Sequence, residues 1–297
     1  MRRPLVSIVT PSFNQAAFLE ETIRSVLEQG YEPLEYVLVE DGSTDGSAEI
    51  AERYADRLTL IRQQNGGQPA AINRGFAATS GELLGFLNSD DTLLPGAVEA
   101  MVYELERDPT SLLVYGDAYY TDERSRRTGY LRAREFDVAA MQRACDNHVV
   151  QPSTLWRREA WETFGPFDED AYYFFDFEFF VRFPRERVLR LELPLSTYRI
   201  HPFAKSSGAD GTRLAREHAR LANRLPSREG RSNALLLGAE FAYEGLDLLR
   251  ARRYSLKGLC AYPRHASPRW LSLAVKSFLP ASVVARLRAR RRRLRTP

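Results

Sequence analysis

The first part of the chain alternates between short apolar runs and longer segments with helical periodicity. The runs are rich in β-branched and aliphatic residues, and each ends in a polar, turn-rich segment, which is typical of buried strands. After the first run, Leu19, Ile23, Val26 and Leu27 fall on one face of a helix that Gly30 can end. The pattern predicts strands at residues 5–10, 36–39 and 58–61 and a fourth that ends near 87, with helices at 19–27, at 47–54 and from Pro69 onward.

Four strands separated by helices predict an α/β fold with a right-handed, mostly parallel open sheet flanked by helices. Such sheets bind ligands beyond the carboxyl ends of their strands, where the polar segments of this chain lie, and we expect this half to bind a nucleotide. Neither a G-x-G-x-x-G fingerprint nor a G-x-x-x-x-G-K-[ST] phosphate loop occurs in the sequence. Their absence argues against a dehydrogenase and against a P-loop enzyme.

Two adjacent carboxylates, Asp90 and Asp91, follow the fourth apolar run. A buried strand is a poor place for unpaired negative charge, so we expect both side chains to face solvent just beyond the strand. One interpretation is a turn that caps a helix beginning near Pro95. The other is a hard oxygen site for Mg²⁺ or Mn²⁺, with positions left open for a diphosphate.

Composition limits the classes of protein to consider. With 297 residues, 44% of them apolar, the chain can hold one large α/β domain and an appendage. Cys145 and Cys260 lie far apart without metal-ligand spacing, which favours a reduced, cytoplasmic protein with two incidental thiols. The apolar run at 5–10 is too short for a signal peptide, and no stretch is apolar enough to predict a transmembrane helix.

The net charge of +3 conceals two oppositely charged parts. After Leu249 the chain has 14 Lys or Arg and no Asp or Glu, so the preceding 249 residues carry −11. Amphipathic helices are expected at 213–225 and at 233–253. Residues 270–278 place aromatic and aliphatic side chains beside Lys and Arg, and an Arg-rich helix is expected at 284–295. We therefore expect three parts: a main domain at 1–205, a helical appendage at 206–268 and a basic amphipathic tail at 269–297.

The basic tail suggests a partner. Apolar residues alternate with its charges, as in segments that lie on an anionic membrane surface. A solvated tail, or one that contacts nucleic acid, is the alternative, but the acidic body disfavours nucleic acid.

Several motifs occur in a fixed order along the main domain. The first four are PSFN at 11–14, VEDGSTD at 39–45, NGG at 65–67 with AINRG at 71–75, and NSDD at 88–91. They are followed by VYGD at 114–117, QPSTLWRR at 151–158, GPFDE at 165–169, DFE at 176–178 and YRIH at 198–201. Together these motifs resemble family 2 glycosyltransferases with the GT-A fold, of the bacterial cell-surface polysaccharide type, and the resemblance covers roughly the first 205 residues.

The resemblance implies transfer of a sugar from a nucleoside diphosphate donor, usually with Mn²⁺ or Mg²⁺ and with inversion at the anomeric carbon. Asp90 would face the ribose or sugar of the donor, and Asp91 would coordinate the metal. Asp41 would accept a hydrogen bond from the base or ribose. The residues that would complete the donor site are Pro11, Phe13, Asn14 and Asn73.

Asp176 matches the family's catalytic base. The aromatic run at 172–180 can exclude water and raise its pKa, which suits a base that removes a proton from an acceptor hydroxyl. The alternative is a core helix with Asp176 as its N-cap. Many relatives carry Glu directly before this Asp, whereas this chain has Phe175, so any role of that Glu is absent.

Two departures from the family pattern lie on the donor side. Glu40 stands where many relatives have Asp, and Ile72 stands where relatives often have Arg near the phosphates. Arg199 and His201 are then candidates for phosphate contact, and His201 also for metal binding, with an ordinary surface or core histidine as the alternative.

Asp117 and Gln151 each end a likely strand and are candidates for the acceptor side. Turn capping by Asp117 and packing of Gln151 before Pro152 are the alternatives.

Three functions compete at this point. The leading one is a metal-dependent inverting glycosyltransferase that acts on a glycan or lipid-linked acceptor, in the cytoplasm or peripherally on the inner face of the membrane. The second is a nucleotidyltransferase, which usually has a Gly-rich basic loop after its first strand. The third is a catalytically silent sugar-nucleotide-binding protein, against which the presence of both Asp91 and Asp176 argues.

Overall fold

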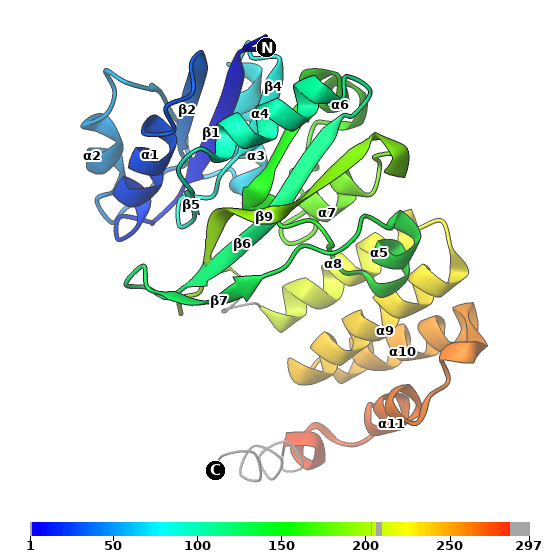
Figure 1. Cartoon of the computed structure of the whole chain (residues 1–297). Coiled ribbons are helices and arrows are strands. Elements are labelled where there is room, and N and C mark those ends of the chain that lie inside the picture. The colour runs from blue at the N-terminus through cyan, green and yellow to red at the C-terminus, as the bar shows by residue number, and fades with distance from the viewer. Residues whose placement is uncertain (1, 203, 206–209, 286–297) are drawn as a thin grey trace. The chain divides into compact units, whose positions relative to one another are not determined.

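The computed structural model describes residues 2–202, 204–205 and 210–285 (Figure 1). The chain forms two compact units, one of Met1–Val138 with Asn147–Ser207 and one of Ala139–Asp146 with Gly208–Pro297. Residues 139–146 therefore group with the second unit, although they precede the boundary expected near 205.

Nine strands form one sheet within the described part of the first unit. Along the sheet the order is β3-β2-β1-β4-β8-β6-β9-β5, and β7 pairs with β6. The strands are β1 (Val6–Ser12), β2 (Leu34–Glu40), β3 (Thr59–Arg62), β4 (Leu83–Phe86), β5 (Thr92–Leu93), β6 (Leu113–Thr121), β7 (Arg127–Leu131), β8 (Thr154–Arg157) and β9 (Val188–Arg199).

The predicted α/β fold is confirmed, with the predicted strands at β1 to β4. These four strands are parallel, whereas β8 runs antiparallel to both β4 and β6, and β5 and β7 are also antiparallel to their partners. β1 continues through Pro11 to Ser12, two residues beyond its predicted end. Pro11 fits there because β1 pairs with β4 only as far as Val9, so its missing N–H costs no hydrogen bond on that side.

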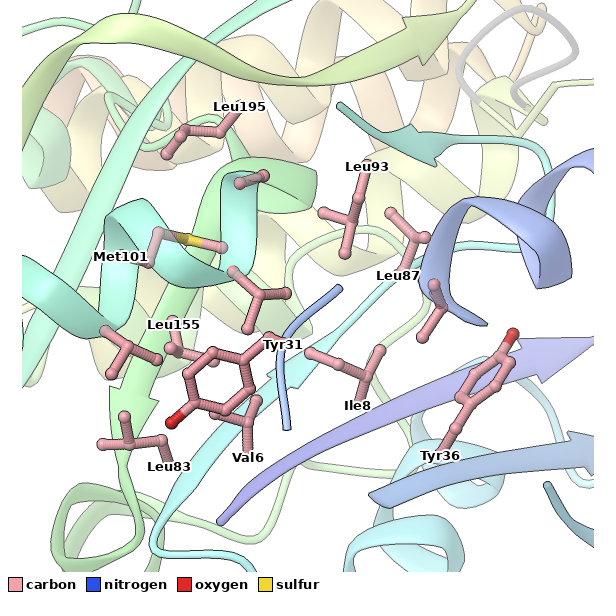
Figure 2. Packing of buried hydrophobic residues seen from close by; sticks show 14 of the residues in the cluster. Val6, Ile8, Tyr31, Tyr36, Leu83, Leu87, Leu93, Met101, Leu155 and Leu195 are labelled. Atoms are coloured by element: carbon pink, nitrogen blue, oxygen red, sulfur yellow. The ribbon is translucent and has the colours of Figure 1, made fainter. Parts of the chain in front are cut away.

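Helices cover the sheet of the first unit (Figure 1). They are α1 (Leu19–Leu27), α2 (Ser47–Glu52), α3 (Gln68–Ala77), α4 (Ala97–Arg107), α6 (Arg158–Phe164) and α7 (Phe175–Phe180), with short 3₁₀ turns η1 (Gln151–Ser153) and η2 (Arg185–Arg187); α5 (Val138–Ala144) begins at the unit boundary. Leu19, Ile23 and Val26 of α1 are buried, as their spacing predicted. Figure 2 shows Val6, Ile8 and Leu83 from the strands gathered with Met101 of α4 in the same apolar core.

A close approach positions α3 on the sheet. A Cβ atom at Gly75 would lie 2.4 Å from Cγ1 of Val9, so only glycine lets the helix pack so near to β1. The N-terminus of α3 then begins directly after the polar loop that follows β3. This packing fixes Gln68, the first residue of the helix, beside the strand ends.

The second unit is helical and contains α8 (Gly211–Arg224), α9 (Arg228–Glu244), α10 (Leu248–Ala261), the 3₁₀ turn η3 (Pro263–His265) and α11 (Pro268–Lys276). The prediction of one helix over 233–253 is wrong, because α9 ends at Glu244 and α10 begins at Leu248. Leu246 adopts a left-handed φ of +62°, and the side chain of Asp247 accepts the backbone N–H of Arg250 as the N-cap of α10. The expected Arg-rich helix at 284–295 lies mostly outside the described residues.

The apolar faces of α9, α10 and α11 meet in a core that includes Leu236, Tyr243, Ala251, Trp270 and Leu273. Among the residues that the structure describes, no helix has both the length and the apolar content to cross a bilayer.

Candidate functional site

The candidate site lies where the strand order of the sheet reverses. From β1 the chain moves outward to β2 and β3, and it then returns to β4 on the other side of β1. The loops after β1 and β4 therefore diverge, and the crevice between them is the usual place for a ligand in an open α/β sheet. Phe13 and Asn14 follow β1, and the NSDD motif at 88–91 follows β4.

Asp41 orders the loop that follows β3. Its Oδ1 accepts hydrogen bonds from Nε2 of Gln63 at 2.7 Å and from the N–H of Gly66 at 2.8 Å, and Oδ2 accepts from the N–H of Gly67 at 3.0 Å. The carboxylate is buried. In this structure Asp41 thus holds the glycine loop in place, which the family resemblance did not indicate.

Asp41→Ala is expected to lower the free energy of unfolding by about 1–3 kcal/mol, because three donors lose a charged acceptor. Chemical denaturation monitored by circular dichroism measures this loss. Asp56→Ala is the matched control, since Asp56 is exposed and should change stability little. Equal stabilities of the two variants would show that the loop does not depend on Asp41.

Asn14 connects the loops after β1 and β2. It has a φ of +52°, its Oδ1 accepts the N–H of Thr44 at 2.8 Å, and its own N–H donates to Oγ of Ser43 at 3.0 Å. Pro11 is buried beside these loops, whereas the ring of Phe13 is 43% exposed. An exposed aromatic ring at this strand end is a surface on which a base or sugar can pack.

Asp91 is only 2% exposed, so the prediction that it faces solvent is wrong. Its Oδ1 accepts the backbone N–H of Arg199 at 2.9 Å, and its Oδ2 accepts from Nδ2 of Asn88 at 3.3 Å. The end of β9 folds over the β4 loop and buries the carboxylate. Burial is the main cause that raises the pKa of Asp91 well above its ordinary value, and the neighbouring charge of Asp90 raises it further.

Arg199 holds the Asp90–Asp91 turn from the β9 side. Its Nε donates to the carbonyl of Asp90 at 2.7 Å, and its Nη2 forms a 2.6 Å ion pair with Glu21 of α1. Nη1 donates to the carbonyl of Asp122 at 3.1 Å and to Oγ of Ser125 at 2.9 Å. The buried guanidinium therefore donates its hydrogen bonds to acceptors within the protein. Its expected contact with phosphate stays a prediction.

His201 faces Asp90. Its Nε2 lies 3.1 Å from Oδ2 of Asp90, its ring packs 4.6 Å from that of Phe18, and its buried Nδ1 has no hydrogen-bond partner in the described part of the molecule. Two carboxylates and an imidazole are suitable ligands for a divalent ion. Among the described residues, however, no three His, Cys, Asp or Glu side chains converge on one point.

Asp176 lies in the first turn of α7, whose N-cap is Phe174, so the N-cap interpretation of Asp176 is wrong. Oδ1 accepts the N–H of Phe177 at 2.8 Å and Oδ2 accepts from Nδ2 of Asn147 at 3.3 Å. Burial among aromatic side chains raises the pKa of Asp176, and the Phe177 N–H and the ammonium of Lys205 offset part of this effect. The residue keeps part of its surface exposed, so a ligand can reach it.

A chain of polar side chains connects the Asp91 side of the site with Lys205. Nζ of Lys205 donates to Oε1 of Gln68 at 2.7 Å, and Nε2 of Gln68 donates to Oδ1 of Asn88 at 2.6 Å. Nδ2 of Asn88 donates to Gln151 at 3.1 Å, whose own amide donates to the carbonyl of Phe86 at 2.7 Å. Asn88 and Gln151 lie within the motifs, but sequence reasoning gave Lys205 and Gln68 no role.

Lys205 also packs on the aromatic run. Its Nζ lies 4.0 Å from the ring centre of Tyr172 and 5.1 Å from that of Phe175. These contacts place a positive charge where it lowers the pKa of Asp176.

Asp117 and Asn73 are held by protein contacts. Oδ2 of Asp117 accepts the hydroxyl of Tyr130 at 2.6 Å, which raises the pKa of Tyr130 to about 12, and Oδ1 accepts the N–H of Ala133 at 2.8 Å. Asn73 exchanges hydrogen bonds with the backbone N–H and carbonyl of Phe167 at 3.0 and 2.9 Å. Both residues order the surroundings of the site, and their contacts with acceptor or donor stay predictions.

A cavity of about 640 Å³ lies between α1 and β5, lined among others by Glu20, Arg24, Glu28 and Thr92. None of the candidate residues lines it. We assign the site to the strand-end crevice because His201 contacts Asp90 there and the backbone of Arg199 holds the adjacent Asp91.

Comparison with known proteins gives the same fold and family. A profile of glycosyl transferase family 2 matches residues 7–177, a range that includes the residues from Pro11 to Asp176. An uncharacterized glycosyltransferase of Bacillus subtilis, EpsJ, is 34% identical over 215 residues, which cover 67% of this chain and 62% of EpsJ. An uncharacterized glycosyltransferase of Rickettsia typhi is 29% identical over 195 residues, which cover 61% of this chain and 59% of that protein. The chain therefore spans about three fifths of the length of these two relatives.

Two solved structures share the fold at low sequence identity. S. aureus TarS 1-349 in complex with UDP-GlcNAc aligns with a TM-score of 0.60 at 16% identity, covering 92% of this chain and 79% of TarS. The mannosyltransferase PcManGT from Pyrobaculum calidifontis, in complex with GDP-Man and Mn2+, aligns with a TM-score of 0.56 at 19% identity, covering 97% and 85%. Since the family profile matches more than half of the chain, the chain belongs to glycosyl transferase family 2.

Proposed function

We propose that this chain is a metal-dependent, inverting glycosyltransferase that moves a sugar from a nucleoside diphosphate sugar to a hydroxyl of a glycan or lipid-linked acceptor. The observation that carries the proposal is the pairing of an Asp90–Asp91–His201 group at the strand-end crevice with Asp176, a partly exposed carboxylate of raised pKa on α7. Family membership and the nucleotide sugars bound to TarS and PcManGT support it.

Asp91 and His201, with Asp90, would hold the divalent ion. The set fits such an ion, because a cation would offset the cost of burying the Asp91 carboxylate beside that of Asp90. Since three protein ligands do not converge, oxygens of the diphosphate would complete the shell. When bound, Mn²⁺ or Mg²⁺ supplies Lewis-acid stabilisation of the departing diphosphate.

The protein's own residues supply orientation and proton removal. Arg199 and Asn88 hold the Asp91 carboxylate in one orientation through its two oxygens. Asp176 takes the proton of the acceptor hydroxyl while the hydroxyl oxygen attacks the anomeric carbon, and the bond to the diphosphate breaks on the opposite face. A single displacement of this kind inverts the anomeric carbon, so an α-linked donor gives a β-linked product.

A panel of nucleoside diphosphate sugars tests the function. With Mn²⁺ present, one sugar nucleotide should raise the melting temperature, and the same nucleotide should support transfer to an acceptor. Stabilisation without transfer to any glycan or lipid-linked acceptor would favour the silent sugar-nucleotide-binding protein. We place the active enzyme in the cytoplasm, peripherally on the inner face of the membrane, where a lipid-linked acceptor is available.

Lys205→Met is expected to move the acid limb of the kcat/KM profile to higher pH. The ammonium lowers the pKa of Asp176, so its removal raises that pKa further, and the base stays protonated up to a higher pH. A pH profile of the purified variant measures the shift. Lys205→Arg keeps the charge and should keep the profile, and Lys257→Met is the control for loss of a distant Lys; a profile unchanged in Lys205→Met would contradict the assigned role.

A further inference from the structure

Helix α11 and the turn after it carry apolar side chains on two faces. Trp270 and Leu273 are buried in the core of the second unit. Leu271 and Val275 of the helix and Phe278 in the turn beyond it, at spacings of four and three residues, form a separate stripe and are 45%, 68% and 56% exposed. A helix that only packs on a core needs one apolar face, and the core of the second unit does not include this second stripe.

Helix α10 repeats the pattern. Leu249 and Leu256, seven residues apart, lie on one helical face and are 77% and 46% exposed. Arg253, which is also exposed, lies between them on the same face, and the exposed Lys257 lies beside it. The apolar side chains of this helix are thus interleaved with basic ones.

The charged side chains that α10 and α11 carry have one sign. Among the described residues after Leu249, at 250–285, the sequence contains seven Lys or Arg and no Asp or Glu. The guanidinium of Arg252 lies 4.0 Å from the ring centre of Phe278, which puts a cation directly against the α11 stripe. Arg269 of α11 pairs with Glu240 of α9, and Arg250 of α10 pairs with its N-cap Asp247, each at 2.5 Å. The helices α10 and α11 themselves contain no Asp or Glu.

This combination selects one class of partner. Nucleic acid is bound by basic and polar side chains, and it offers no site for isolated Leu, Val and Phe side chains between the charges. A second copy of the chain would bring two basic stripes together, which like-charge repulsion opposes. An anionic lipid surface satisfies both features, since acyl chains accept the apolar side chains and headgroups accept the Lys and Arg.

We propose that two apolar stripes insert into an anionic lipid surface, that of α10 (Leu249 and Leu256) and that of α11 with the turn after it (Leu271, Val275 and Phe278). Arg253, Lys257 and Lys276 would contact its headgroups. This inference rests on the proposed function, because a lipid-linked acceptor gives the protein a reason to bind a membrane. It assigns binding to two folded helices, whereas the sequence had pointed to the tail at 269–297 alone.

Vesicle flotation with the full chain tests the proposal. The protein should float with vesicles of phosphatidylcholine and phosphatidylglycerol but not with phosphatidylcholine alone, and high salt should weaken the binding. The triple variant L271S/V275S/F278S should lower partitioning by about tenfold or more. The double variant R253Q/K257Q should lower it by about fivefold per charge.

The matched control is Y103S/L193S, which removes two side chains of the first unit that are 49% and 40% exposed. It should float as the unchanged protein does. Substitutions serve better than truncation before Trp270, because Trp270 and Leu273 belong to the core of the second unit. Circular dichroism confirms that each variant is folded.

The proposal would be overturned if L271S/V275S/F278S and R253Q/K257Q both floated as the unchanged protein does. Loss of flotation of the unchanged protein when RNA is added in excess would overturn it as well. A different outcome is that the unchanged protein fails to bind vesicles and associates with itself in sedimentation in a concentration-dependent way. If only L271S/V275S/F278S abolished that association, the partner would be a second copy of the chain, and the proposal would be overturned. Transfer to a soluble acceptor should be unchanged in both variants. If that transfer is absent in the unchanged protein, the proposed function fails while the flotation result stands by itself.

Discussion

Asp176→Asn is expected to lower turnover by about 100-fold or more while leaving donor affinity nearly unchanged. Asn keeps the shape of the side chain, and its carbonyl oxygen can still accept the N–H of Phe177. It loses the proton affinity that a general base requires and the 3.3 Å hydrogen bond from Asn147. Steady-state kinetics together with calorimetric donor binding separates the two effects.

The same substitution should stabilise the fold at neutral pH. Because burial raises the pKa of Asp176 in the folded state, the folded state binds this proton more tightly than the unfolded chain does. Stability from this group is present below the ordinary Asp pKa of about 3.9 and is lost as the pH rises through the raised value. Thermal melts of wild type and Asp176→Asn should therefore nearly coincide at low pH and diverge toward neutral pH, with the variant the more stable.

Asp170→Asn is the control, because Asp170 is exposed and close in sequence, and it should change neither turnover nor the melting profile. Proton NMR of the product's anomeric signal tests the stereochemistry, and retention would overturn the single displacement. Near-normal turnover in Asp176→Asn would move the base elsewhere, with Glu178 and Asp117 the next residues to replace.

Asp91→Asn is expected to remove metal-dependent donor binding, with a loss of at least about 100-fold in donor affinity in the presence of Mn²⁺. Replacing a residue that only hydrogen-bonds to a metal ligand typically lowers metal affinity about 10- to 100-fold. Neutralising a proposed metal ligand itself should lower it at least as much. Asn is the better replacement, because its carbonyl oxygen can still accept the backbone N–H of Arg199. Asp91→Ala would leave that buried N–H unsatisfied and cost about 1–3 kcal/mol of stability as well.

Titration calorimetry with and without Mn²⁺ measures this effect, and Asp56→Asn controls for the loss of an exposed carboxylate. Unchanged donor affinity in Asp91→Asn under both conditions would refute the role of Asp91 at the metal.

Local patterns were enough to predict the elements that carry the site. The strands β1, β2 and β4 and helix α1 follow from apolar periodicity, because each buries one face or run of its own residues. The apolar run of β3 also predicted a strand, although none of its residues is fully buried. The same reasoning failed in the second unit, where the helix at 233–253 is interrupted. There Gly245 and the capping Asp247 were a local signal that the amphipathic pattern on both sides obscured.

The candidate chemical groups could be chosen from the sequence, and their roles stay predictions, whereas their environment could not be predicted. Adjacent carboxylates after a strand, and a carboxylate in an aromatic run, are local features that point to Asp91 and Asp176. Burial of Asp91 under the end of β9, the clamp formed by Arg199, and the contact of Lys205 with Gln68 join residues 108, 109 and 137 positions apart. These contacts form only when distant segments of the chain come together in the folded sheet. The free energy that favours them therefore depends on the tertiary structure, and no periodic pattern in the sequence indicates them.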